Sequence, residues 1–287
     1  MDITYSSADG LNLYAKSYGP EDAPITALCM HGLTRNHKDF EPMIEALLKL
    51  RSDVRFIAVD VRGRALSDKD PNPENYTPLV YAQDMVALLD HLGLEKVFLI
   101  GTSMGGLMSM ILMTMIPQRV HGVVLNDIGP VLMKKGLDRI QSYVGGTTIK
   151  DSWEEAANAV ASVQKVAFPD YTDEQWMAFA KRTYRELEDG RVELDYDPEI
   201  SRSVKEVRPN IFTNMAMWKL FRAMKPVPML LVRGELSDLL SPKNANKMVR
   251  KHGNAKLVTV ARVGHTPLLD EPTVVEALNE FLSQETK

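Results

Sequence analysis

The sequence predicts an α/β fold: a mostly parallel central sheet with helices on both faces, into which a helical cap is inserted. Short apolar strand-like runs alternate with helix-like segments as far as residue 128 and again from residue 226, which is typical of a parallel sheet covered on both faces. Between residues 129 and 225 the strand pattern is absent and helix-like segments follow one another. We therefore expect one α/β core made of residues 1–128 and 226–287, and a helical cap at 129–225.

The strands are predicted from apolar runs and turn signals. Ala8-Asp9-Gly10 separates two alternating segments, 3–6 and 11–17, and so predicts an opening antiparallel hairpin. Each later strand is a short continuous apolar run, the pattern of a strand buried on both faces. The later strands are expected at 25–30, 56–60, 97–100, 120–126, 229–232 and 256–260.

The helices are predicted from longer segments with helical apolar spacing, bounded by Gly, Pro and Asp. In the cap, helix-like segments are separated by Gly145-Gly146, by Phe168-Pro169 and by residues 195–198. Core helices are expected at 39–50, 79–92, 106–116, 242–251 and 273–282, and cap helices at 153–166, 173–187 and 211–223.

Composition excludes several classes of function. A net charge of −4 provides no concentrated basic face for nucleic acid. The N-terminus lacks the pattern of a secretory signal and no run of about 18 apolar residues occurs. The single cysteine, Cys29, lies in an apolar strand and cannot form an intrachain disulfide. We expect a cytoplasmic protein that is not membrane-bound; its oligomeric state stays open, with a homodimer as one alternative.

Gly101-Thr102-Ser103-Met104-Gly105 lies between a predicted strand and a predicted helix. That context is the one in which a Gly-x-Ser-x-Gly motif forms a sharp nucleophile turn. The glycines remove Cβ atoms that would collide in so tight a turn. Ser103 is therefore the predicted nucleophile.

A serine nucleophile needs a base and an acid that orients the base. His265 follows the last predicted strand, so its loop should reach the same sheet edge as Ser103. For the acid we favour Asp238, which follows the strand at 229–232, in the order Ser, Asp, His. Asp127, at the end of the strand 120–126, is the alternative acid.

Two backbone N–H groups are expected to form the oxyanion hole. One belongs to Met104, directly after the nucleophile, and the other to Leu33 in the loop after the strand 25–30. His31 in the same loop is expected to brace it by hydrogen bonds rather than to transfer protons.

Taken together, these motifs resemble the α/β-hydrolase superfamily, in particular its cap-bearing serine hydrolases: carboxylesterases, lactonases and carbon–carbon bond hydrolases. The resemblance spans essentially the whole chain. It implies no metal and no organic cofactor. One departure is Ala65, which stands where the second glycine of the Asp-x-Arg-Gly-x-Gly-x-Ser loop is usual. The motifs that carry the resemblance are His31-Gly32, Asp60-Val61-Arg62-Gly63, the turn at Ser103, Asp238 and Gly264-His265.

Substrate contacts are less clearly marked. Arg35 could hold a substrate carboxylate through its planar guanidinium, with His37 nearby, or it could pair with Asp39. Trp153 and Trp176 are candidates to line an apolar pocket under the cap, although aromatic residues at helical spacing are usually packing residues.

These observations predict a serine hydrolase that cleaves a small carboxylic ester or related acyl substrate through an acyl-enzyme. The alternatives are a carbon–carbon bond hydrolase of a ring-fission dienone acid, an enol-lactonase, and a ligand receptor that retains the triad.

Overall fold

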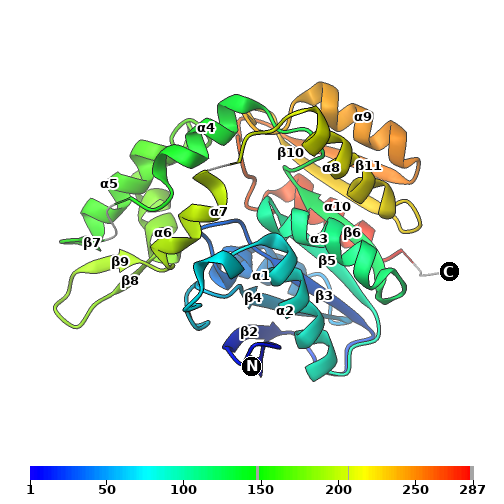
Figure 1. The fold of residues 1–287 in the computed structure, drawn as a ribbon, viewed down its shortest axis with the longest axis horizontal. Coiled ribbons are helices and arrows are strands. Elements are labelled where there is room, and N and C mark those ends of the chain that lie inside the picture. Colours follow the sequence, from blue (N-terminus) through cyan, green and yellow to red (C-terminus); the bar gives the residue numbers. More distant parts are fainter. Residues whose placement is uncertain (147–148, 206, 285–287) are drawn as a thin grey trace.

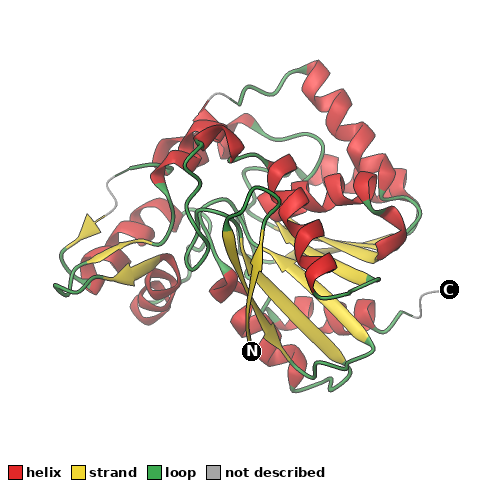
Figure 2. Cartoon of the chain, turned by 60° about the horizontal axis from the view of Figure 1, so that its bottom comes forward, coloured by secondary structure: helices red, strands yellow, loops and turns green. Residues whose placement is uncertain are grey.

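The computed structural model describes residues 1–146, 149–205 and 207–284 (Figure 1). A central sheet carries helices on both faces, and the segment between two of its strands forms a smaller lobe, on the left in Figures 1 and 2. The sequence prediction of an α/β fold with an inserted segment is confirmed for the central sheet and its helices.

Eight strands form the central sheet in the order β1-β2-β4-β3-β5-β6-β10-β11. The opening hairpin of β1 and β2 is antiparallel, and β2 pairs antiparallel with β4. From β4 onward in this spatial order, all neighbouring strands pair in parallel. All strands expected in the core are present. Their bounds are β1 Asp2–Ser6, β2 Asn12–Tyr18, β3 Ile25–Met30, β4 Val54–Asp60, β5 Val97–Thr102, β6 Val120–Asn126, β10 Met229–Gly234 and β11 Ala255–Val260.

The core helices cover the two sheet faces with two apolar clusters. Along β3, Leu28 and Met30 join the cluster beneath α2, α3, α8 and α9, while Ala27 and Cys29 join the cluster beneath α1 and α10. This alternation is why the strands are apolar throughout. The core helices are α1 Glu41–Leu48, α2 Pro78–His91, α3 Met104–Met115, α8 Ile211–Ala223, α9 Pro242–His252 and α10 Pro272–Leu282.

The segment between β6 and β10 differs from the sequence prediction in two respects. It contains a three-stranded antiparallel sheet, β7-β9-β8, where only helices were expected. It also contributes α8 to the core, because α8 packs against α3. We call the part from α4 to α7 the insertion. Its elements are α4 Lys134–Tyr143, β7 Ile149–Lys150, α5 Trp153–Gln164, α6 Asp173–Thr183, β8 Tyr184–Glu186, β9 Val192–Leu194 and α7 Arg202–Lys205.

The predicted helix 173–187 is wrong beyond Thr183. Tyr184, Arg185 and Glu186 pair with β9 instead of continuing α6. Arg and Glu favour helices, but the partner strand supplies backbone hydrogen bonds and a packing surface, and this tertiary context overrides weak local propensity.

Close backbone packing fixes the turn between β5 and α3. Ser103 has φ 50° and ψ −108°, a sparsely populated conformation for a residue with a side chain. A Cβ atom on Gly105 would overlap the Met30 carbonyl oxygen, and one on Gly101 would overlap the Gly105 carbonyl oxygen. These glycines let α3 start directly against β3 and β5, as the sequence predicted. No helix in the described parts of the chain is both long and apolar enough to cross a membrane.

Gly105→Ala is expected to destabilise the fold by about 1–3 kcal/mol or more, because the added methyl group meets a rigid carbonyl group. Thermal unfolding measures the effect. Gly32→Ala is the matched control, since the nearest atom to its added methyl would be 3.6 Å away. Equal melting temperatures for the two variants would contradict this explanation of the turn.

Candidate active site

Ser103 and His265 lie within hydrogen-bond distance at the carboxyl edge of the parallel strands. The Ser103 hydroxyl oxygen is 3.0 Å from His265 Nε2. Ser103 is held by its backbone, whose N–H donates to the Asn126 carbonyl and whose carbonyl accepts from Gly106 N–H. His265 is 8% exposed and lies in the loop that follows β11. The structure therefore brings together the predicted nucleophile and base.

Asp127 is the acid that contacts the base. His265 Nδ1 lies 2.8 Å from Asp127 Oδ2. The Asp127 carboxylate also accepts hydrogen bonds from the Ser237 hydroxyl, at 2.6 Å, and from Gly234 N–H, at 3.3 Å. Asp127 is fully buried, and a buried carboxylate needs such donors to offset its lost hydration. With Nδ1 donating to Asp127, Nε2 is left to accept the serine proton.

Asp238 does not occupy the position that the sequence analysis favoured. Its carboxylate accepts a bidentate pair of hydrogen bonds from Arg139 of α4, at 2.7 and 3.0 Å. Burial alone would raise the pKa of Asp238, but these hydrogen bonds and the Arg139 charge lower it below its ordinary value. Strands β6 and β10 are neighbours, so acids after either strand reach this edge. In the β10 loop Ser237, not Asp238, contacts Asp127.

The oxyanion loop follows β3 and is anchored to the nucleophile turn, since Gly105 N–H donates to the His31 carbonyl. Within the described residues, neither Leu33 N–H nor Met104 N–H has a protein acceptor. Both groups are thus available to a ligand oxygen, as expected of an oxyanion hole.

His31 braces this loop. Its Nε2 accepts from Val61 N–H at 3.1 Å and its Nδ1 lies 2.7 Å from the Gly32 carbonyl. Burial lowers the pKa of His31 to about 4, so the ring is neutral near pH 7. In this neutral form each ring nitrogen has one hydrogen-bond partner. His31 has the bracing hydrogen bonds that were expected of it.

Arg64, which the sequence analysis did not single out, contacts both residues of the predicted oxyanion hole. Its Nε donates to the Leu33 carbonyl at 3.0 Å, and Nη2 lies 3.7 Å from the Met104 sulfur. Its side chain is fully buried, stacked 4.8 Å from the centre of the Tyr81 ring. No carboxylate in the described parts of the chain forms an ion pair with it. A buried arginine with carbonyl and aromatic partners holds its neighbours in place and adds positive charge behind the site.

The loop that carries Arg64 tolerates the unusual Ala65. Ala65 adopts φ 43°, the left-handed region that favours glycine. Its N–H donates to the Asp195 carbonyl of the insertion, and Asp197 N–H donates to the Gly63 carbonyl. These contacts hold the loop in the conformation that glycine would adopt without strain.

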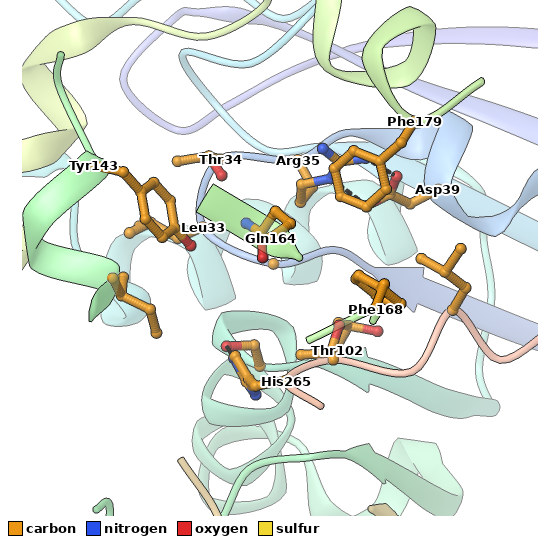
Figure 3. Close-up of a pocket in the computed structure, with 15 residues that line it drawn as sticks. Leu33, Thr34, Arg35, Asp39, Thr102, Tyr143, Gln164, Phe168, Phe179 and His265 are labelled. Atoms are coloured by element: carbon orange, nitrogen blue, oxygen red, sulfur yellow. Dashed lines mark hydrogen bonds and ion pairs between the residues drawn. The ribbon is translucent and has the colours of Figure 1, made fainter. Parts of the chain in front are cut away.

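A pocket beside Ser103 and His265 lies between the core and the insertion (Figure 3). His265 and Thr102 line one side of it, and Arg35, Asp39 and Phe179 line the opposite side. We call this the polar chamber. Its other lining residues are Gly32, Leu33, Thr34, Ile140, Tyr143, Gln164, Phe168, Thr266 and Leu268.

Arg35 lines the polar chamber but its charge is already paired. The guanidinium makes a bidentate ion pair with Asp39, at 2.7 and 2.5 Å, and also donates to the Thr183 hydroxyl. Burial alone would raise the pKa of Asp39, but the Arg35 charge and hydrogen bonds lower it. His37 is likewise paired, with Asp60, at 2.8 Å.

The two tryptophans proposed as substrate contacts are packing residues. Trp176 is buried in the apolar cluster of the insertion and Trp153 packs against that cluster. Phe168 and Phe179 from the same cluster reach the polar chamber instead. Helical spacing indicated that aromatic residues pack together, but not which ring faces the chamber. Within the described residues, no three His, Cys, Asp or Glu side chains gather into a metal-binding group.

A second pocket also adjoins Ser103 and Leu33. It has a volume of about 190 Å³. Leu33, Ser103 and Ile140 border both pockets. We call this the apolar chamber. Its remaining lining residues are Pro78, Tyr81, Met104, Leu107, Ile128, Leu132, Leu137, Ser203, Val204, Val207 and Leu239.

Asp238→Asn is expected to lower the melting temperature at pH 7 by about 5 °C, because it leaves the Arg139 guanidinium unpaired. The folded-state pKa of Asp238 is depressed, so the stabilisation is present above the unfolded pKa and is lost as pH falls through the folded pKa. The difference from wild type should shrink below about pH 4. Asp138→Asn, in an exposed pair with Lys134, is the control and should change little. A pH-independent difference would argue against the ion pair as its source.

The comparisons with known proteins agree with this fold. Residues 28–272 match the family model described as the alpha/beta hydrolase fold. The chain is 32% identical over 271 residues to a 3-hydroxybutyrate-oligomer hydrolase from Cupriavidus necator, covering 93% of this chain and 91% of that protein. It is 28% identical over 276 residues to a 2-(acetamidomethylene)succinate hydrolase from Mesorhizobium japonicum, covering 95% and 91%. The crystal structure of an alpha/beta hydrolase from Novosphingobium aromaticivorans has a TM-score of 0.89 at 38% identity, covering 98% of this chain and 97% of that one. The chain therefore belongs to the α/β-hydrolase family.

Proposed function

We propose that this protein is a serine hydrolase that cleaves a small carboxylic ester through an acyl-enzyme. The observation that carries the proposal is the continuous hydrogen-bond chain from Ser103 through His265 to Asp127, with distances of 3.0 and 2.8 Å. A serine hydroxyl is a weak nucleophile on its own, and such a chain supplies both a base and a group that orients the base.

In the first half of the reaction, the Ser103 oxygen attacks the ester carbonyl carbon while His265 Nε2 takes the hydroxyl proton. The imidazolium is stabilised by the buried Asp127 carboxylate. When the tetrahedral intermediate collapses, the bond to the alcohol oxygen breaks and His265 returns the proton to that oxygen. In the second half, water attacks the acyl-enzyme with the same base, and the acid is released with Ser103 restored.

The negative oxygen of each tetrahedral intermediate would be held by Leu33 N–H and Met104 N–H. These donors are set in position before substrate arrives, because Gly105 N–H ties the turn to the His31 carbonyl and Arg64 ties Leu33. Preorganised donors stabilise the transition state without reorganisation during the reaction.

One of the relatives supports an ester rather than a carbon–carbon bond as the target. Units of 3-hydroxybutyrate joined head to tail are linked by esters, and the relative named for hydrolysing such oligomers covers almost the whole chain. A ring-fission dienone acid would need a free cation for its carboxylate, whereas Arg35 is paired with Asp39. Turnover of any ester also separates this proposal from a receptor that only binds.

Ser103→Ala is expected to abolish hydrolysis of nitrophenyl acetate or hexanoate while leaving the circular dichroism spectrum unchanged. Asp127→Asn should lower kcat by about 10⁴, because the base loses its orientation and charge partner. Asp238→Asn is the matched control and should retain activity within about tenfold at a temperature where it is folded. A larger loss for the Asp238 variant than for the Asp127 variant would restore Asp238 as the acid.

Arg64→Met is expected to lower kcat with little change in KM. The decrease should be smaller than the factor of roughly 10²–10³ by which kcat falls when an oxyanion donor itself is removed. The variant removes the donor to the Leu33 carbonyl but keeps an unbranched side chain of similar length. Binding of a boronic acid, which forms a negatively charged tetrahedral adduct on serine, should weaken in parallel with kcat. Arg64→Lys should recover part of both effects. Unchanged boronate affinity would mean that Arg64 only supports folding.

A further inference from the structure

Ser103 lies where two chambers of different character meet, one lined almost wholly by apolar side chains and the other by a mixture of polar and apolar side chains. The apolar chamber is lined almost entirely by hydrocarbon side chains, among them Leu107, Leu137 and Leu239. The polar chamber presents Thr34, Gln164 and the Arg35–Asp39 pair. An ester bound at Ser103 has two substituents, the acyl chain and the alcohol, and each must enter one chamber.

The position of His265 distinguishes the two chambers. His265 lines the polar chamber, together with its neighbour Thr266, and is not among the residues that line the apolar chamber. Met104, whose N–H would hold the oxyanion in the proposed mechanism, lines the apolar chamber. In the proposed mechanism His265 must deliver a proton to the leaving alcohol oxygen, so that oxygen and its substituent lie on the His265 side.

We infer that the apolar chamber binds the acyl chain and the polar chamber binds the leaving alcohol. The preferred substrate is then an ester of an aliphatic acid with an alcohol that carries further polar groups. A cavity of about 150 Å³ admits benzene, so the volume of about 190 Å³ fits a chain of about six carbons. This inference rests on the proposed ester hydrolysis.

The assignment can be tested because the two halves of the reaction see different substituents. Deacylation begins after the alcohol has left, so its rate depends on the acyl group alone. A variant of the acyl chamber must therefore change deacylation. A variant of the alcohol chamber must change acylation according to the alcohol. It must leave the order of deacylation rates across the acyl series unchanged, because the water that attacks the acyl-enzyme meets His265 in that chamber whatever the acyl group.

The experiment uses rapid-mixing kinetics on the full chain with two ester series. One series joins nitrophenol to acids from acetate to octanoate, and the other joins hexanoic acid to alcohols with and without further hydroxyl or amide groups. Leu107→Phe narrows the apolar chamber, Leu137→Ala widens it, and Gln164→Leu removes a polar group from the other chamber. Circular dichroism and thermal unfolding confirm that each variant is folded.

We expect Leu107→Phe to lower kcat/KM for hexanoate relative to acetate by about tenfold or more and to change the hexanoyl deacylation rate. Leu137→Ala should move the preferred acyl chain to a greater length. Gln164→Leu should reduce the preference for polar alcohols without altering which acyl group deacylates fastest. Two outcomes would reverse the assignment and so overturn it. One is that Leu107→Phe changes only the alcohol preference. The other is that Gln164→Leu changes the preferred acyl-chain length and the order of deacylation rates. Absence of turnover on every ester by folded wild-type protein would instead reject the proposed function on which it rests.

Discussion

The buried carboxylate of Asp127 is the constraint around which this site is arranged. A charge with no solvent exposure is stable in a fold only if donors surround it, and here they come from His265, Ser237 and Gly234. His265 lies on the loop after β11, Ser237 lies on the loop after β10 and Gly234 ends β10, while Asp127 directly follows β6. Satisfying one charge therefore fixes the relative positions of three loops. The orientation of the His265 ring toward Ser103 follows from it.

Sequence patterns predicted the core well because its signals are local. An apolar run, a glycine-bounded turn and a helix define the strand–turn–helix at Ser103, and each can be recognised within a few residues. The choice between Asp127 and Asp238, in contrast, depends on contacts between distant parts of the chain, which no local pattern shows. Both acids follow neighbouring parallel strands and both precede His265 in the chain, so spacing and order fit either one equally. What separates them is a contact across 99 positions, the pairing of Asp238 with Arg139.

The same limit explains the errors in the inserted segment. The residue types of Tyr184-Arg185-Glu186 are compatible with a continued helix. The segment is a strand because it pairs with β9. Trp153 and Trp176 are large apolar residues that could equally line a cavity or fill a core, and they fill the core of the insertion. Arg64 lies at a position where the sequence motif specifies no residue type. Its importance appears only when the Leu33 carbonyl and the Met104 side chain are seen on either side of it.

The insertion does more than cover the nucleophile, because it is bonded to the catalytic loops at several points. Arg139 of α4 pairs with Asp238, directly beside the Ser237 that donates to Asp127. Gly136 N–H donates to the Asp238 carbonyl, and a Cβ atom at Gly136 would come 2.5 Å from that oxygen. Because α4 also carries Ile140, which borders both chambers, these contacts fix the wall between them. Asp238, the acid that does not contact His265, therefore supports the site indirectly: through Arg139 it helps to hold α4, and with it Ile140 at the wall between the two chambers.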